Sequence, residues 1–322
     1  MSTGRQFLPE CNRDQYADVW KKRHSFLSAI EEVCRRHGIS SQSAKVFETG
    51  SNLVVQVTPE LIVKLYFPFL RDQFESERSV LKAIKGRLTV ATPELFFEGE
   101  LEGWPYIIMG FVTGTSLGEI WSSIEQSNKL SIMKELGQII RALHEVPTDS
   151  LKESFPNDWN NFLTRQLEGC ISRHQKTGLP ENLLSELPSL LPASAAAIWD
   201  GKKPVLISGD FTPEHILLSK QSGKWSVVGL IDFADCMIGQ HEYDFTGPAT
   251  FITCGDTELL TQMFISYGYT RDSLNADLRR RMMLLTILHR FANFKEQVRV
   301  EGWQQKFTTL LQVEQFLWGF DK

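Results

Sequence analysis

The second half of the chain contains two apolar runs that each adjoin an aspartate: Val205-Leu-Ile-Ser-Gly-Asp210-Phe-Thr-Pro-Glu-His215-Ile-Leu-Leu218 and Val227-Val-Gly-Leu-Ile-Asp232-Phe-Ala-Asp235. Short apolar runs bounded by turn residues are typical of buried strands. Asp210 follows the first run, and Asp232 ends the second run 22 positions later. We therefore expect a hairpin-like arrangement that directs the two carboxylates toward one place.

Two carboxylates in such an arrangement suit phosphoryl transfer. That reaction needs little covalent chemistry from the protein, but it needs a carboxylate that orients the attacking hydroxyl and accepts its proton. A second group must hold a metal ion against the triphosphate. The D-x-x-x-x-H motif from Asp210 to His215 and the Ile231-Asp232-Phe233 motif predict both functions.

The first hundred residues change their hydrophobic period several times, which is typical of short strands that alternate with helices. An amphipathic helix is predicted over residues 20–37, and another over residues 73–84. The helix over 73–84 places Phe74, Val80, Leu81 and Ile84 on one side. Five strands are predicted, over residues 44–49, 53–57, 61–67, 94–98 and 106–111.

The pattern becomes helical after Thr113. Helices are predicted over residues 131–146, 159–174, 183–199, 256–267, 274–294 and 303–318. Only two short strands are expected among them, over residues 205–208 and 225–232. The sequence thus predicts an α+β chain in two lobes. Residues 1–112 form a lobe with a small antiparallel sheet, and residues 113–322 form a mainly helical lobe.

Composition excludes several classes of protein. The 322 residues are 42% hydrophobic and 23% charged, which is ordinary for a globular chain with a large core. A net charge of -5 argues against a nucleic-acid partner, because affinity for nucleic acid comes chiefly from Lys and Arg.

The cysteines indicate a reducing compartment. Five cysteines are scattered along the chain without C-x-x-C spacing, so neither a disulfide framework nor a zinc site is expected. No stretch approaches the ~18 apolar residues of a membrane helix. No signal-peptide pattern precedes Trp20. We expect a cytoplasmic protein without a membrane partner.

The motifs together resemble the aminoglycoside phosphotransferase family, a branch of the protein-kinase-like fold, and the hygromycin B phosphotransferases most of all. Ser208-Gly209-Asp210 with His215 resembles the catalytic loop, and Ile231-Asp232-Phe233 resembles the metal-binding motif. The resemblance implies Asp210 as catalytic base, Asp232 as metal ligand and His215 at the second metal position. It also implies ATP, or alternatively GTP, as the donor, with Mg²⁺ or Mn²⁺.

Further matches extend the resemblance into the first lobe. Ile62-Val63-Lys64-Leu65 is similar to the strand that carries the phosphate-binding lysine, and Glu77 to the glutamate that pairs with it. Glu77 is preferred to Glu75 because of its spacing from the end of the helix. The remaining expected contacts are the phosphate loop Gly50, Ser51 and Asn52, the adenine-binding hinge at Met109 and Phe111, and Asp235 beside the acceptor.

Two positions depart from the family pattern. His215 stands in place of an asparagine, and imidazole suits softer metals better than Mg²⁺, so its ligation remains open. Ser208 replaces a histidine that normally packs behind the metal motif, and we expect reduced rigidity there. Asp244 is interpreted as a brace on the metal-loop side. His144 and His289 are interpreted as packed residues.

The acceptor is the least defined part of the hypothesis. The C-terminal helices mix acidic and basic residues, so they do not single out a polycationic ligand. A hygromycin-type aminocyclitol is the first hypothesis, and choline, a sugar or a homoserine-like alcohol are the alternatives. A nucleotide-binding pseudokinase is the rival of a different class. A protein kinase is disfavoured because no D-F-G to A-P-E activation segment follows Asp232. The oligomeric state stays open.

Overall fold

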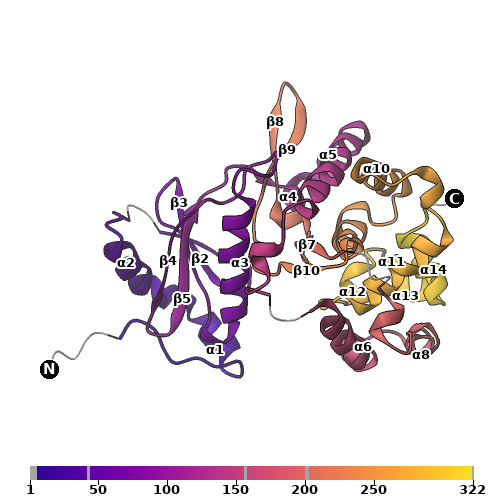
Figure 1. The fold of residues 1–322 in the computed structure, drawn as a ribbon, viewed down its shortest axis with the longest axis horizontal. Coiled ribbons are helices and arrows are strands. Elements are labelled where there is room, and N and C mark those ends of the chain that lie inside the picture. The colour runs from indigo at the N-terminus through magenta and orange to yellow at the C-terminus, as the bar shows by residue number, and fades with distance from the viewer. Residues whose placement is uncertain (1–5, 42–43, 156–157, 200–202, 321–322) are drawn as a thin grey trace. The chain divides into compact units, whose positions relative to one another are not determined.

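A computed structural model describes residues 6–41, 44–155, 158–199 and 203–320 (Figure 1). The described residues form two compact units. Unit 1 comprises those within Met1–Lys85, Ala91–Thr113 and Leu230–Asp235, and unit 2 those within Gly86–Val90, Gly114–Gly229 and Cys236–Lys322. The division at residue 112 places Leu230–Asp235 in the second lobe, whereas this segment packs within unit 1.

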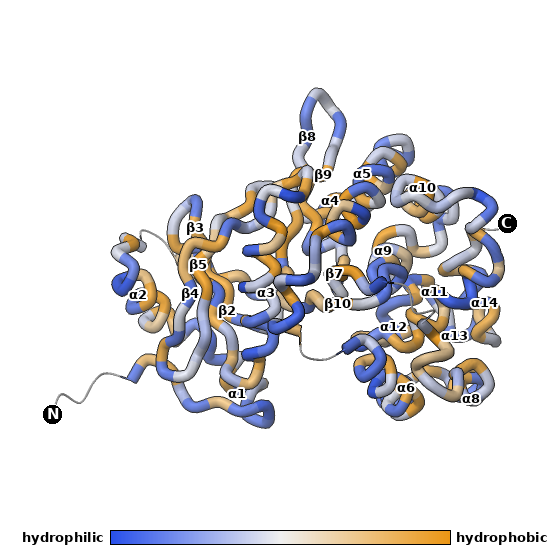
Figure 2. The backbone as a smooth tube through the Cα atoms, viewed as in Figure 1, coloured by the Kyte–Doolittle hydropathy of each residue, from blue (hydrophilic) through white to orange (hydrophobic). Residues whose placement is uncertain are grey.

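Unit 1 contains a five-stranded antiparallel sheet in the order β1-β2-β3-β5-β4. Each strand lies within a few residues of a predicted one, because alternating and apolar runs separated by turns define these strands locally. Six of the seven residues of β5 are buried, and in Figure 2 the hydrophobic colour covers part of this strand. The bounds are β1 Lys45–Phe47, β2 Leu53–Gln56, β3 Leu61–Leu65, β4 Leu95–Leu101 and β5 Trp104–Gly110.

Helix α3 (Arg71–Ile84) packs against β4 and β5. Its buried residues recur at intervals of three and four, which places them on one face. They include an acidic residue, Glu77, among apolar neighbours. A carboxylate in that position needs a charged or hydrogen-bonding partner, because burial of an unpaired charge is costly.

The helix predicted over residues 20–37 is three shorter pieces: α1 (Tyr16–Lys21), a 3₁₀ turn at Arg23–Phe26, and α2 (Leu27–Arg36). The Ser25 hydroxyl donates to the Lys22 carbonyl at 2.7 Å. Such local bonds from serine compete with helix continuation. Only α2 contributes a regular buried face, through Ala29, Ile30, Val33 and Cys34.

Unit 2 is mainly helical, with two small antiparallel strand groups. Strands β7 (Val205–Ile207) and β10 (Met237–Gly239) pair with each other. Strands β6 (Thr115–Ser116), β8 (Ile216–Gln221) and β9 (Lys224–Leu230) form the other sheet. The sequence did not predict β6, β8 or β10, because runs of two to six residues carry little periodic signal.

The long helices of unit 2 lie close to their predicted positions, and α10 packs along α5 (Figure 1). These are α5 (Gln126–His144), α6 (Trp159–Lys176), α10 (Thr257–Tyr267) and α11 (Ala276–Leu288). The shorter helices are α4 (Leu117–Ile120), α7 (Glu181–Leu184), α8 (Leu187–Leu190), α9 (Thr246–Pro248), α12 (Phe294–Gln297), α13 (Trp303–Lys306) and α14 (Leu310–Leu317).

Three predicted helices of unit 2 are also interrupted. The prediction of one helix over residues 183–199 is wrong. Leu191 adopts an extended conformation before Pro192, and the chain forms only α7, α8 and one 3₁₀ turn there. The helix over 274–294 ends at Leu288, where His289 adopts an extended conformation. The helix over 303–318 breaks before Thr309, whose side chain forms a capping box that starts α14.

The predicted α+β class is confirmed by the antiparallel sheet of unit 1 and the helices of unit 2. No helix in the described ranges has the length and hydrophobicity needed to span a bilayer.

Candidate active site

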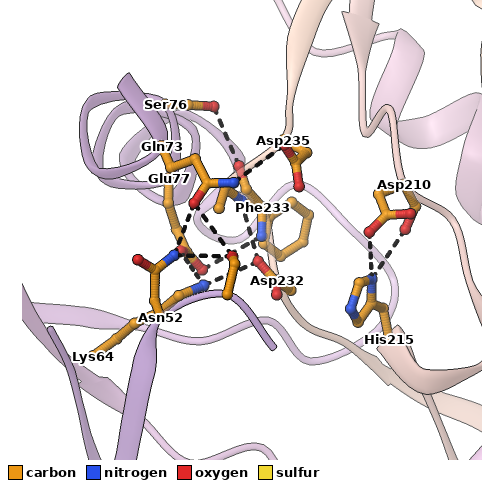
Figure 3. A network of polar contacts seen from close by, with 12 residues as sticks. Asn52, Lys64, Gln73, Ser76, Glu77, Asp210, His215, Asp232, Phe233 and Asp235 are labelled. Atoms are coloured by element: carbon orange, nitrogen blue, oxygen red, sulfur yellow. Dashed lines mark hydrogen bonds and ion pairs between the residues drawn. The ribbon is translucent and has the colours of Figure 1, made fainter. Parts of the chain in front are cut away.

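Three of the predicted residues meet inside unit 1. The Lys64 ammonium, on β3, lies 2.7 Å from Glu77 Oε2 and 2.9 Å from Asp232 Oδ1 (Figure 3). Glu77 comes from α3, and Asp232 comes from the segment that follows β9. The side chains of Lys64 and Glu77 are 5% and 0% exposed, whereas that of Asp232 is 35% exposed. Asp232 is therefore the partner that solvent or a ligand can reach.

The two carboxylates determine the charge state of the lysine. Burial lowers the pKa of Lys64, but the carboxylates of Asp232 and Glu77 outweigh burial, and the pKa lies above its ordinary value. Burial also raises the pKa of Glu77, and the Lys64 ammonium opposes that rise. The lysine is thus a fixed cation across the physiological pH range.

Tyr66 completes this cluster and was missed in the sequence. Its hydroxyl donates to Glu77 Oε2 at 2.6 Å. Burial, and after it the Glu77 carboxylate, raise the pKa of Tyr66 well above its usual range, so the phenol keeps its proton. Strand period could have indicated this residue, because Tyr66 is two positions from Lys64 and side chains two apart point to the same side.

Backbone strain marks the aspartate itself. Asp232 has a φ of 62°, in the left-handed region that residues other than glycine rarely adopt. The next residue is held to α3 at both main-chain polar groups: Phe233 N–H donates to Glu77 Oε1 at 3.4 Å, and Ser76 Oγ donates to the Phe233 carbonyl at 3.3 Å. Such outliers persist only where surrounding contacts hold them.

The predicted phosphate loop joins β1 to β2. Gly50 has a φ of 102°, which favours glycine there. The Asn52 side chain is buried: its Oδ1 accepts from Phe67 N–H at 3.4 Å, and its Nδ2 donates to Gln73 Oε1 at 2.8 Å. Any phosphate contact by Asn52 would therefore use its main chain, while Ser51 is exposed.

The predicted adenine hinge lies at the end of β5. Met109 is buried and paired in register with Ile62 and Leu95. The N–H of Phe111 donates to the Glu60 carbonyl at 2.7 Å. That donor is committed within the sheet region, so the role of Phe111 toward adenine remains a prediction that does not use its N–H.

Asp210 and His215 meet inside unit 2 (Figure 3). His215 Nδ1 lies 3.0 Å from the main-chain oxygen of Asp210 and 3.7 Å from its Oδ2. A carbonyl oxygen only accepts, so Nδ1 must carry the proton in this contact. In the neutral ring the lone pair is then on Nε2, which is the arrangement found at metal-ligating histidines.

Asp244 fixes the main chain just before Asp210. Its Oδ2 accepts from Ser208 N–H at 2.8 Å, and its Oδ1 accepts from Gly209 N–H at 2.7 Å. The predicted bracing role is corrected in one respect: these contacts of Asp244 are to the predicted catalytic loop rather than to the metal-loop side. His144 is buried as predicted, and its Nε2 lies 3.0 Å from Asp244 Oδ2.

Asp235, predicted beside the acceptor, is part of unit 1. Its Oδ1 accepts from Gln73 Nε2 at 3.4 Å. Gln73 was missed in the sequence, although it lies four positions before Glu77 and hence on the same face of α3. The acceptor role of Asp235 remains a prediction.

The residues of this site could hold a Mg²⁺ ion only if a substrate supplied further ligands. Among the described residues there is no cluster of three or more His, Cys, Asp or Glu side chains that could hold a metal ion. Mg²⁺ is commonly held by one or two carboxylates together with substrate phosphates, so a single partly exposed carboxylate such as Asp232 is compatible with that chemistry.

Residues 44–284 match the APH family, described as a phosphotransferase enzyme family. No curated protein sequence matches the chain significantly. The match covers most of the chain and includes every site residue discussed above.

Solved structures share the fold. The GDP and kanamycin complex of APH(2'')-IIia is 18% identical, with a TM-score of 0.67, over 90% of this chain and 97% of that chain. The streptomycin–ATP–APH(2'')-IIa ternary complex is 15% identical, with a TM-score of 0.60, over 88% and 95%. Macrolide 2'-phosphotransferase MphH from Brachybacterium faecium is 14% identical, with a TM-score of 0.58, over 81% and 90%. The predicted fold class is confirmed.

Proposed function

Since the chain belongs to the phosphotransferase enzyme family, we propose that it transfers the γ-phosphate of ATP to a hydroxyl of a small molecule. The observation that carries the proposal is the buried ion pair of Lys64 and Glu77 beside the more exposed Asp232. A buried ammonium held by one permanent and one accessible carboxylate can exchange the accessible partner for a phosphate oxygen.

Lys64 binds and orients the phosphates in this proposal. Glu77 is inaccessible and stays with the lysine, which keeps the ammonium in place without a ligand. Asp232 would hold the divalent cation, which would neutralise negative charge on the phosphates when bound, and His215 is the proposed second metal position. Gly50 and Ser51 would close over the phosphates with main-chain N–H groups.

Asp210 acts as the base. Its carboxylate would orient the acceptor hydroxyl and take its proton as the oxygen attacks phosphorus. Asp244 supports this role, because it ties down the two N–H groups that precede Asp210. The side chain of Asp210 is 25% exposed, which is compatible with contact to a substrate.

We propose an aminoglycoside or aminocyclitol antibiotic as the acceptor, with hygromycin B tested first. Two structures with the same fold contain kanamycin or streptomycin, which supports this class. GTP is the alternative donor. Choline, sugar and homoserine-like alcohols are the alternative acceptors, and a pseudokinase is the alternative without transfer.

The test is nucleotide consumption by the purified protein. ATP and GTP, each with Mg²⁺ or Mn²⁺, are combined with hygromycin B, kanamycin, streptomycin, choline, homoserine and a hexose. We expect acceptor-dependent turnover that Asp210→Asn abolishes while nucleotide affinity is retained. Tight nucleotide binding with no turnover for any acceptor would instead support the pseudokinase.

A further inference from the structure

Gln73 connects two segments of unit 1 that are far apart in sequence. Its Oε1 accepts from Asn52 Nδ2 at 2.8 Å, and its Nε2 donates to Asp235 Oδ1 at 3.4 Å (Figure 3). Asn52 belongs to the loop between β1 and β2, and Asp235 follows Asp232 by three positions. One side chain on α3 thus bonds both the predicted phosphate loop and the predicted metal loop.

The two end groups of this series of hydrogen bonds determine which group donates at each step. At one end is the main-chain N–H of Phe67, which can only donate, so the group of Asn52 that faces it must be the oxygen. Asn52 Nδ2 then donates to Gln73, and Gln73 must present Oε1 to it and Nε2 to Asp235. The carboxylate at the other end accepts from Nε2, so neither amide can be reversed without loss of bonds at both of its sides.

Gln73 also completes a row of contacts along α3. Ser76 and Glu77 lie three and four positions after it, on the same face of the helix. Ser76 Oγ and Glu77 Oε1 bond the main chain of Phe233, and Gln73 bonds Asp235. This face therefore holds the 232–235 segment at successive points, and Gln73 also bonds Asn52.

We propose that Gln73 is a positioning residue that couples nucleotide binding at the Gly50–Asn52 loop to the placement of the Asp232–Asp235 loop. A shift of the first loop that moves Asn52 would pull on the amide of Gln73 and hence on Asp235. The inference rests on the proposed function, since it assigns the two loops to nucleotide and metal.

Variants can separate the two sides of Gln73. Gln73→Glu keeps an acceptor for Asn52 but sets a carboxylate against Asp235, and Gln73→Leu removes both bonds. The double variant Gln73→Glu with Asp235→Asn restores a donor and acceptor in reversed order and restores the net charge. Arg71→Gln, at an exposed position of the same helix, makes the helix more negative without touching either loop.

The first measurement is ATP affinity by calorimetry, with and without Mg²⁺. We expect Gln73→Glu to reduce the gain in affinity from Mg²⁺ about fivefold, the size of one lost hydrogen bond, with metal-free affinity within about twofold of wild type. The reversed double variant should recover the gain, and Arg71→Gln should leave it unchanged. A Gln73→Glu protein with the wild-type gain, or a double variant no better than the single one, would overturn the proposal.

The second measurement needs no nucleotide and so separates this inference from the proposed function. Amide hydrogen exchange of residues 233–236 is compared between the wild type and the variants, under conditions in which the proteins have the same thermal stability. Asn52→Leu should accelerate that exchange about fivefold, but not when Gln73→Leu is already present. If Asn52→Leu has no effect on residues 233–236, the coupling through Gln73 is absent. If the wild-type protein fails to bind ATP or GTP, the proposed function is wrong whatever the exchange data show.

Discussion

The ammonium of Lys64 and the carboxylate of Glu77 are 2.7 Å apart, and both side chains are almost fully buried. Desolvation makes such a pair a weak source of net stability, yet removal of Glu77 leaves the buried Lys64 ammonium with the partly exposed Asp232 carboxylate in place of a fully buried partner. The pair is also held by Tyr66, whose hydroxyl bonds the same oxygen of Glu77. This arrangement keeps Lys64 in one position whether or not Asp232 is engaged elsewhere.

We therefore expect Glu77→Gln to lower the free energy of unfolding by about 3 kcal/mol. Glu75→Gln is the matched control, because Glu75 is partly exposed and its ion pair, with Arg78, is a surface pair worth at most about 1 kcal/mol. Urea denaturation at neutral pH measures both. Equal losses for the two variants would show that the buried pair has no special role.

Acid pH should destabilise the protein through His289. Burial, and after it the Arg290 guanidinium, lower the pKa of His289 to about 3. Phe291 N–H donates to its Nδ1, which requires an unprotonated nitrogen. Below the ordinary value of 6.5 the unfolded state gains a proton that the folded state does not take up until about pH 3, so stability falls as the pH falls through that window.

Between about pH 7 and about pH 5 we expect this group to remove about 2 kcal/mol from the free energy of unfolding. The measurement is denaturant unfolding of wild type and His289→Gln across that range. The variant lacks the titrating ring, so the difference between the two proteins should shrink toward acid pH. A constant difference would mean that His289 is protonated equally in both states.

Strand positions in unit 1 were predictable because local hydrophobic runs and turn residues determine them. Three of the interrupted helices were not, because each of these breaks depends on a specific event: a serine hydroxyl that bonds back to the main chain at Lys22, an extended conformation at His289, and a capping box at Thr309. Periodicity alone continues through such positions, since the apolar spacing is preserved on both sides of them.

The candidate site was predictable to the extent that motifs name individual residues. Lys64, Glu77 and Asp232 were identified from the family motifs, and they meet in unit 1. Supporting residues such as Tyr66, Gln73 and His144 belong to no motif, because their function is defined only by the atoms they contact. Helix and strand spacing from a known site residue would have identified the first two.

Asp244→Asn should weaken catalysis and stability together. The change replaces one acceptor oxygen by a donor that faces a main-chain N–H, at a position where both oxygens now accept. A buried carboxylate bond to N–H is worth about 2 kcal/mol, and we expect a loss of that size in unfolding free energy with a larger proportional fall in kcat than in nucleotide affinity. Asp277→Asn, at an exposed site, should change neither. Unchanged kcat in Asp244→Asn would refute the bracing role.

Gly247 is required for a close approach to the predicted catalytic loop. A Cβ at this position would lie well inside van der Waals contact with the Phe211 carbonyl oxygen, one residue after Asp210. Gly247→Ala should therefore cost more than about 2 kcal/mol of stability and reduce turnover, because a backbone must shift. Gly169→Ala, in α6, meets nothing closer than 3.6 Å and should stabilise the protein by about 0.5–1 kcal/mol. Thermal unfolding of the two variants in parallel checks the contrast.

His215 should set the metal preference of the enzyme. Because its Nδ1 donates to the Asp210 carbonyl, the lone pair of the neutral ring is on Nε2, and a nitrogen ligand favours Mn²⁺ over Mg²⁺. We expect the ratio of half-saturating Mg²⁺ to half-saturating Mn²⁺ to fall about tenfold in His215→Asn, which supplies an amide oxygen instead. His24→Asn, on the exposed surface of unit 1, is the control and should leave the ratio unchanged. An unaltered ratio in His215→Asn, with turnover retained, would show that His215 serves only to hold the main chain at Asp210.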